Sequence, residues 1–120
     1  YEKDELCKKI LTQYLNHFEF PFEVSVFGDF FERKEIRRRD LIINTSGEHM
    51  EDISKMKSYF KGNPAVAIQS NNYFGLDEHV NCVHTVEELI EKNQIKNIFY
   101  KGELDFPKYT RYMIIGHWYV

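Results

Sequence analysis

Two short aliphatic runs, Leu41-Ile42-Ile43 and Ala65-Val66-Ala67-Ile68, decide the fold that the sequence predicts. Unbroken runs of this length are typical of strands that are buried on both faces of a sheet. The segment between them repeats apolar residues at helical spacing and ends at Gly62 and Pro64. Its apolar residues are Met50, Ile53, Met56, Tyr59 and Phe60. The order strand, helix, strand predicts a βαβ unit with parallel strands.

The N-terminal part predicts a helix followed by a strand. Between Asp4 and Phe18, apolar residues three and four positions apart form one stripe of an amphipathic helix. These residues are Leu6, Ile10, Leu11, Tyr14, Leu15 and Phe18. After Pro21, alternation through Phe22, Val24 and Val26 predicts a strand. We expect Phe18, Phe22, Tyr59 and Phe60 to be core residues rather than a base-stacking platform.

The C-terminal part predicts strand, helix and two final strands. Val80–Val83 is a short apolar strand candidate. Thr85 with Glu88 three positions later forms a capping box, so a helix is expected from there to about Asn93. Apolar residues from Ile95 to Tyr100 and the β-forming tail 112–120 predict two strands that pair as a hairpin.

These elements together predict the α/β class. We expect a small three-layer sheet, parallel or mixed, with helices on both faces and a C-terminal β-hairpin. The chain of 120 residues and 14.5 kDa is long enough for one packed domain, so residues 1–120 are expected to form a single domain. The chain begins at Tyr1 rather than Met, which favours a fragment of a larger protein.

Composition excludes several classes of protein. Sixteen basic and nineteen acidic residues give a net charge of -3, which argues against a protein that mainly coats nucleic acid or an anionic membrane. No stretch reaches the roughly 18 to 20 apolar residues of a membrane-spanning helix, and the opening residues do not resemble a signal peptide. Two cysteines, Cys7 and Cys82, are too few for a disulfide framework. We therefore expect a cytoplasmic protein that does not contact a membrane.

One segment, Asp77–His84, gathers carboxylates, two histidines and a cysteine. Zinc sites use paired ligand spacings, and His79-x-x-Cys82-x-His84 has no matching second pair. On a strand, Cys82 and His84 would share a face, but Cys-x-His alone is a weak nucleophile–base signal. We therefore expect a buried Cys82, with no catalytic residues and no metal site. Isolated glycines form no phosphate-binding loop, so no cofactor is expected either.

The densest positive charge lies between Arg33 and Arg39. Its cations could contact phosphate or a nucleic-acid backbone, although Glu32, Glu35 and Asp40 dilute the charge. The candidate contacts are Arg33, Arg37, Arg38 and Arg39. The simpler interpretation is a solvated connection between hydrophobic strands.

The tail is the most apolar end of the chain. As a last strand it could complete the edge of the sheet or pair with another subunit, because an edge strand exposes unpaired backbone groups. Ile115, Trp118 and Tyr119 are the residues expected at such an interface. The sequence thus favours a homodimer.

The order of elements over residues 4–72, with Asp40-Leu41-Ile42-Ile43-Asn44-Thr45 in the strand after the charged connection, resembles the EIIB domains of the sugar phosphotransferase system. Those domains carry a phosphorylatable cysteine before their first helix. Cys7 lies inside the predicted helix and does not match that position. The pattern is similar to the EIIB-like domains that close Mga/AtxA-type virulence regulators, which have a regulatory and dimerising role.

This resemblance implies a non-enzymatic regulatory and self-association domain of a transcription regulator. DNA would be contacted only by domains outside this chain. Two alternatives stay open. One is a small nuclease or phosphotransferase domain that uses Cys82, His84 and the basic segment, and the other is a stand-alone binding protein such as an immunity protein.

Overall fold

The computed structural model describes residues 1–21, 24–33 and 35–120, with the backbone but not the side chain of Arg37. Contacts between residues divide the chain into two units, Tyr1–Glu35 and Ile36–Val120. None of the helices in the described part of the chain has the length and apolar character that crossing a membrane requires.

The first unit contains the predicted N-terminal helix, α1, at Glu5–Asn16. Asp4 caps it, because its carboxylate accepts the backbone N–H of Cys7 at 2.8 Å. None of the residues of α1 is buried, and Phe18 just beyond it is also exposed, so the expectation that Phe18 is a core residue is wrong.

The strand predicted after Pro21 does not form at Val24 and Val26, whose backbone is irregular, and Phe22 lies outside the described residues. A short 3-10 helix, η1, follows at Phe30–Glu32, and Phe30 packs its ring edge against Tyr1 at 5.1 Å between centroids. Alternation over so few residues did not identify a strand, because a strand also needs a neighbour with which to pair.

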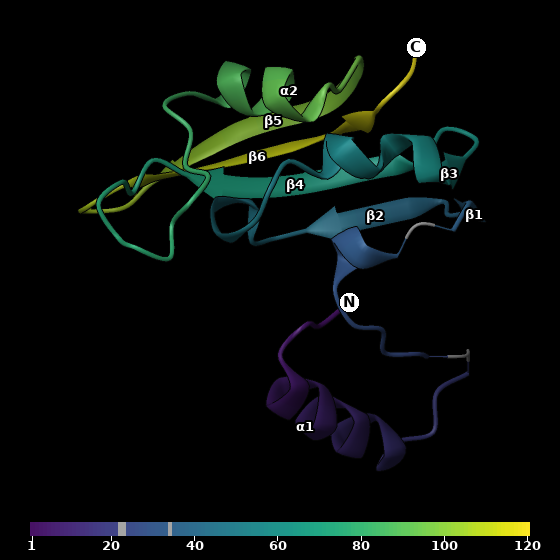
Figure 1. Ribbon diagram of the computed structural model, residues 1–120. Helices are drawn as coiled ribbons and strands as arrows, with labels where there is room; N and C mark the ends of the chain where they lie inside the picture. Colours follow the sequence, from purple (N-terminus) through teal and green to yellow (C-terminus); the bar gives the residue numbers. More distant parts are fainter. Residues whose placement is uncertain (22–23, 34) are drawn as a thin grey trace. The chain divides into compact units, whose positions relative to one another are not determined.

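The second unit is built on a four-stranded sheet (Figure 1). Its strands are β2 at Leu41–Asn44, β4 at Ala65–Asn71, β5 at Asn97–Asp105 and β6 at Thr110–His117. The order is β2-β4-β6-β5, in which β2 and β4 are parallel and the other two pairs are antiparallel. The two aliphatic runs therefore form neighbouring parallel strands, and the α/β class with a mixed sheet is confirmed.

The segment between β2 and β4 forms 3-10 helices instead of the expected α-helix. They are η2 at Gly47–His49 and η3 at Ile53–Tyr59, after which β3 at Phe60–Lys61 pairs in parallel with β1 at Arg37–Arg38. Met50, Ile53, Met56 and Tyr59 are spaced by three residues. This spacing matches the three residues per turn of a 3-10 helix better than the 3.6 of an α-helix.

The helix α2 at Val86–Asn93 lies over β5 and β6 on one face of the sheet (Figure 1). The predicted cap is present, since Thr85 Oγ1 accepts the Glu88 N–H at 3.1 Å. The core of this unit lies between that face, α2 and η3. Its most deeply buried side chains are Trp118, Ile53, Met56, Ile68, Ile114, Val66 and Val83.

The opposite face of the sheet, which we call the open sheet face, is apolar and accessible. Strand register places on it the side chains that alternate with the buried ones. Its apolar residues are Leu41, Ile43, Ala65, Ala67, Tyr100, Leu104, Met113 and Ile115. The expectation that the first aliphatic run is buried on both sides is therefore wrong, because Leu41 and Ile43 are exposed.

Two further expectations need correction. Residues 80–83 form no strand, and they belong to the connection that leads from β4 to α2. The tail is not at the edge of the sheet, because β6 is hydrogen-bonded to β4 on one side and to β5 on the other. Its backbone groups are satisfied within the chain, so they cannot pair with a second subunit.

Candidate functional site

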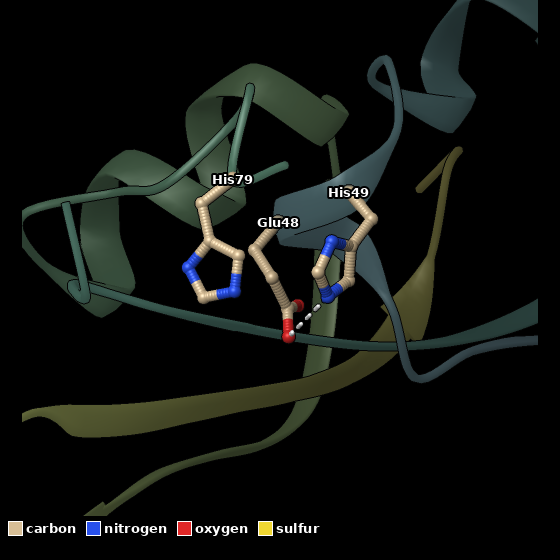
Figure 2. A group of neighbouring side chains, drawn as sticks. All are labelled: Glu48, His49 and His79. Carbon is tan, nitrogen blue, oxygen red and sulfur yellow. Dashed lines mark ion pairs between the residues drawn. The ribbon is translucent and has the colours of Figure 1, made fainter. Parts of the chain in front are cut away.

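A polar cluster lies where the parallel strands β2 and β4 end. The short helix η2 follows β2 and carries Glu48 and His49, and the connection after β4 carries His79 (Figure 2). The carboxyl ends of parallel neighbours meet at one edge of a sheet, which brings these three residues together although about thirty positions separate them in sequence. Gly47 permits the approach, since a Cβ there would lie 2.6 Å from the Gln69 carbonyl oxygen.

The two imidazoles are oriented by backbone carbonyls. His49 Nδ1 lies 3.0 Å from the Glu78 carbonyl oxygen, and His79 Nδ1 lies 2.8 Å from that of Tyr73. A carbonyl oxygen only accepts hydrogen bonds, so each Nδ1 carries the proton. In the neutral rings, each Nε2 then has a lone pair available.

Glu48 is the buried member of the cluster, with a relative exposure of only 5%. Its Oε1 accepts from Arg111 Nη1 at 3.2 Å and lies 3.8 Å from His49 Nε2. Its Oε2 is buried and has no hydrogen-bond partner among the residues that the structure describes. One nitrogen from each histidine and a carboxylate oxygen lie within 4.8 Å of one another, so this cluster could hold a metal ion.

Arg111, from β6, fixes the carboxylate in place. Its Nε donates to Gln69 Oε1 at 2.9 Å, and its Nη2 donates to the Thr45 carbonyl at 2.6 Å. The guanidinium thus connects β6, β4 and the end of β2 while it neutralises Glu48.

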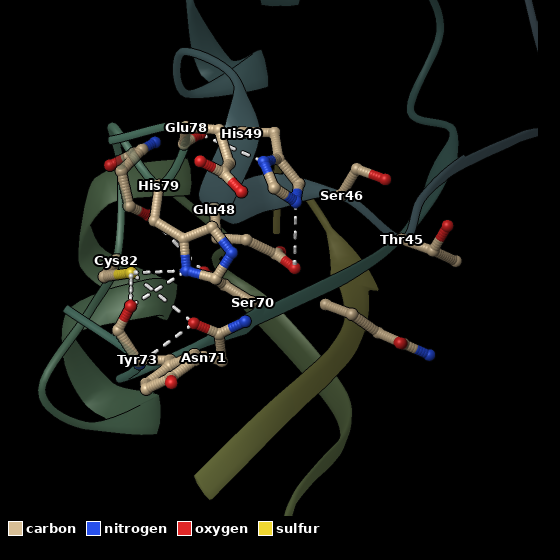
Figure 3. A network of polar contacts seen from close by, with 12 residues as sticks. Thr45, Ser46, Glu48, His49, Ser70, Asn71, Tyr73, Glu78, His79 and Cys82 are labelled. Carbon is tan, nitrogen blue, oxygen red and sulfur yellow. Dashed lines mark hydrogen bonds and ion pairs between the residues drawn. The ribbon is translucent and has the colours of Figure 1, made fainter. Parts of the chain in front are cut away.

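Cys82 lies on the far side of the His79 ring (Figure 3). Its sulfur is 3.4 Å from both Asn71 Oδ1 and the Tyr73 carbonyl oxygen, and 3.7 Å from His79 Nδ1. Burial, followed by the charge of Glu48, raises the pKa of the Cys82 thiol. A protonated thiol that donates to oxygen acceptors is a poor nucleophile. The expectation that Cys82 is buried is confirmed.

The side chain of His84 contacts residues other than Cys82. Its Nδ1 lies 3.1 Å from Glu88 Oε2, and its ring stacks on Phe74 with centroids 4.5 Å apart. The histidine next to the Cys82 thiol is instead His79. The geometry therefore gives no support to a Cys82–His84 nucleophile and base.

The basic segment has mostly internal contacts. Arg33 pairs with Glu35 and lies over the Phe27 ring at 3.6 Å, and Arg39 Nη1 donates to the Arg38 carbonyl at 2.6 Å. The side chain of Arg37 lies outside the described part of the chain. These contacts fit the simpler interpretation of a solvated connection.

The three tail residues expected at an interface lie in different surroundings. Ile115 is on the open sheet face, and Tyr119 is exposed with Lys57 Nζ 4.2 Å from its ring centroid. Trp118 has 0% relative exposure, and its Nε1 donates to the Asn93 carbonyl at 3.1 Å. Trp118 is therefore a core residue and cannot contact a partner.

Comparisons with protein-family models, with curated proteins and with solved structures found no match to this chain.

Proposed function

We propose that this chain is a non-enzymatic self-association domain in which the open sheet face packs against the same face of a second copy. The observation that carries the proposal is the row of exposed apolar side chains on that face. Ile43 is 65% exposed and Leu104 is 62% exposed, and Leu41 and Tyr100 are about half exposed. Contiguous apolar patches of this kind are typical of interaction sites.

The charge on the open sheet face favours a partner of the same kind. Arg111 shares this side of the sheet, and its charge is neutralised by Glu48. A surface without net charge offers no complement to a strongly acidic or basic partner. In a two-fold dimer the same patch is used by both copies, so an apolar patch is complementary to itself.

The size of the face is adequate for a modest interface. Strands about 4.8 Å apart that rise about 3.3 Å per residue give four strands of these lengths a footprint of about 440 Å². Side-chain relief adds to this value, and a standard interface buries about 800 Å² per partner. Two such faces would stack about 10 Å apart, as sheets do in sandwiches.

The regulatory part of the proposal comes from the resemblance to EIIB-like domains of transcription regulators. The antiparallel pairing of β5 with β6 through residues 106–109 supports the C-terminal β-hairpin of the expected fold. In this proposal the dimer aligns DNA-binding domains that lie outside this chain, in the cytoplasm. Self-association would then set the spacing of their binding sites.

The expected three-layer EIIB-like fold also provides the rival hypothesis to the proposed interface. In that fold helices cover both faces of the sheet, and a helix on the open sheet face would leave no room for a second copy. The rival predicts that the open sheet face takes no part in a dimer, whereas the proposal predicts that this face is the interface.

Sedimentation equilibrium of the 120-residue chain over a wide concentration range tests the proposal. We expect a reversible dimer, and we expect Leu104→Lys and Ile43→Lys each to convert it to a monomer, because each buries a charge in the interface. Val80→Lys is the matched control. Val80 is 70% exposed but lies in the connection between β4 and α2, outside the open sheet face, so the dimer should persist.

A wild-type chain that stays monomeric at every concentration would contradict the proposal. A dimer that survives both sheet variants but is lost in Ile10→Lys, on the exposed stripe of α1, would assign the interface to the helix and equally overturn it.

A further inference from the structure

We infer that Glu48, His49 and His79 form a binding site for a divalent transition-metal ion. This inference is independent of the proposed self-association, because it concerns the edge of the sheet and not its open face. It rests on the donor set, on the buried carboxylate oxygen and on the orientation of both imidazoles.

The donor set suits a transition metal. Two imidazole nitrogens and one carboxylate oxygen are the protein ligands of many zinc centres and of non-haem iron(II) centres. Calcium and magnesium prefer sites made of oxygen ligands, which this cluster does not offer. Three protein ligands also leave coordination positions for water or another small ligand.

The carboxylate of Glu48 gives the second, independent indication. Oε1 is occupied by Arg111, whereas the buried Oε2 has no hydrogen-bond partner among the described residues. Leaving a buried polar atom unsatisfied costs about 1 to 3 kcal/mol, so such an atom usually has a partner such as an ion or a water molecule. A cation that is bound by both oxygens of this carboxylate would satisfy Oε2.

The histidines are prepared for coordination by their outer contacts. A metal-binding histidine commonly donates its second ring N–H to a backbone carbonyl, which fixes the tautomer and the ring orientation. His49 does so to Glu78 and His79 does so to Tyr73. Both Nε2 atoms are consequently left for the metal (Figure 2).

The supporting structure fixes the connection that carries His79. Asn81 N–H donates to the Glu48 carbonyl at 3.0 Å, and Asn81 Nδ2 donates to the Met50 carbonyl at 2.9 Å. The two segments that supply ligands are thus joined to each other by backbone and side-chain hydrogen bonds. A site whose ligands come from one fixed framework loses less entropy on binding.

A modest rotation completes the site. Ligands about 2.0 to 2.2 Å from one ion lie roughly 3 to 3.5 Å apart, whereas the three donor atoms lie within 4.8 Å of one another. The His49 side chain is 43% exposed, and its Nε2 already lies 3.8 Å from Glu48 Oε1. Cys82 is not a ligand in this arrangement, because its sulfur contacts His79 on the Nδ1 side of the ring.

Titration of the metal-free 120-residue chain with Zn²⁺ by calorimetry, and with Co²⁺ by visible absorption, tests the site. We expect one saturable site per chain and a Co²⁺ spectrum of a nitrogen- and oxygen-ligated centre. His49→Ala and His79→Ala should each weaken binding at least tenfold, because even residues that only orient a ligand account for about 10- to 100-fold in affinity.

His84→Ala is the matched control, since His84 is exposed and contacts Glu88 and Phe74 outside the cluster. It should bind Zn²⁺ like the wild type. Circular dichroism of each variant checks that the fold is retained, and His49→Ala is the most informative variant because His49 is the more exposed ligand. Absence of saturable binding, or equal losses in His84→Ala and His49→Ala, would overturn the inference.

Discussion

Two neighbouring residues on β6 show how much the burial of side chains differs between the two faces of the sheet. Ile114 points into the core beneath α2 and has no exposed surface, whereas Ile115, one position later, lies on the open sheet face beside Tyr100. The same residue type thus serves two purposes in one strand. On one face apolar side chains stabilise the chain itself, and on the other they are exposed, where we propose that a second copy binds.

The difference shows that apolar character alone does not locate a core. Ile43 and Leu104 are as hydrophobic as Ile68 and Ile114, but they are 65% and 62% exposed. Burial depends on the elements that pack over a face. The helices α2 and η3 contact each other on the covered face of the sheet.

The largest effect is expected from Trp118→Ala. Trp118 fills the core, and its indole N–H is bound by the Asn93 carbonyl, so its removal leaves a cavity and an unpaired acceptor. We expect a loss of about 3 to 5 kcal/mol in the free energy of unfolding. Tyr119→Ala, at the adjacent exposed position, should cost far less in the same urea denaturation experiment. Similar losses in both variants would show that Trp118 is not a core residue.

Ile114→Ala and Ile115→Ala compare the faces directly. Truncation at the fully buried Ile114 should cost about 2 to 5 kcal/mol in unfolding free energy. Truncation at Ile115 should cost clearly less when unfolding is measured at a protein concentration where the chain is monomeric, because less surface is lost from the core. Equal costs would mean that the open sheet face is covered within the monomer.

Gly47→Ala tests the sheet edge, where backbone packs on backbone. The added Cβ would meet the Gln69 carbonyl at 2.6 Å, so η2 must move away from β4. We expect a destabilisation of about 1 to 3 kcal/mol and a weaker affinity for Zn²⁺, since η2 carries two of the proposed ligands. Wild-type stability and metal affinity in this variant would contradict the close approach described here.

The smallest effect is expected at the start of α2, the helix that covers the inner face. The backbone N–H and the imidazole of His84 hold the pKa of Glu88 below its ordinary value of 4.5. A lowered pKa in the folded state adds stability above the ordinary pKa, and this stability is lost as the pH falls through the lowered value. The difference in unfolding free energy between wild type and Glu88→Gln should therefore shrink in acid. A difference that stays constant from pH 7 to about pH 3 would be inconsistent with this linkage.

Local signals in the sequence predicted much of the fold. The cap at Thr85 and the two aliphatic runs depend on neighbouring residues, and all three correspond to observed elements. The segment 47–60 was predicted as α-helical although its apolar residues are three apart, which is the period of the 3-10 helices that form.

The pairing of strands that are distant in the sequence could not be predicted from local sequence patterns. Nothing local indicates that β6 lies between β4 and β5, so the tail was expected at an edge and Trp118 at an interface. The polar cluster was not predicted for the same reason, because Glu48 and His49 lie about thirty positions from His79 in the sequence. The available signal was that His49 and His79 each follow one of two predicted parallel strands.

If a second copy of the chain covers the open sheet face, as we propose, side chains on that face must contact the other copy. Filtered nuclear Overhauser spectra of a mixture of isotope-labelled and unlabelled chains measure contacts between copies directly. We expect contacts between copies from the methyl groups of Ile43, Leu104 and Ile115, and none from Ile114. Contacts between copies that exclude these three residues, or none at millimolar concentration, would contradict it.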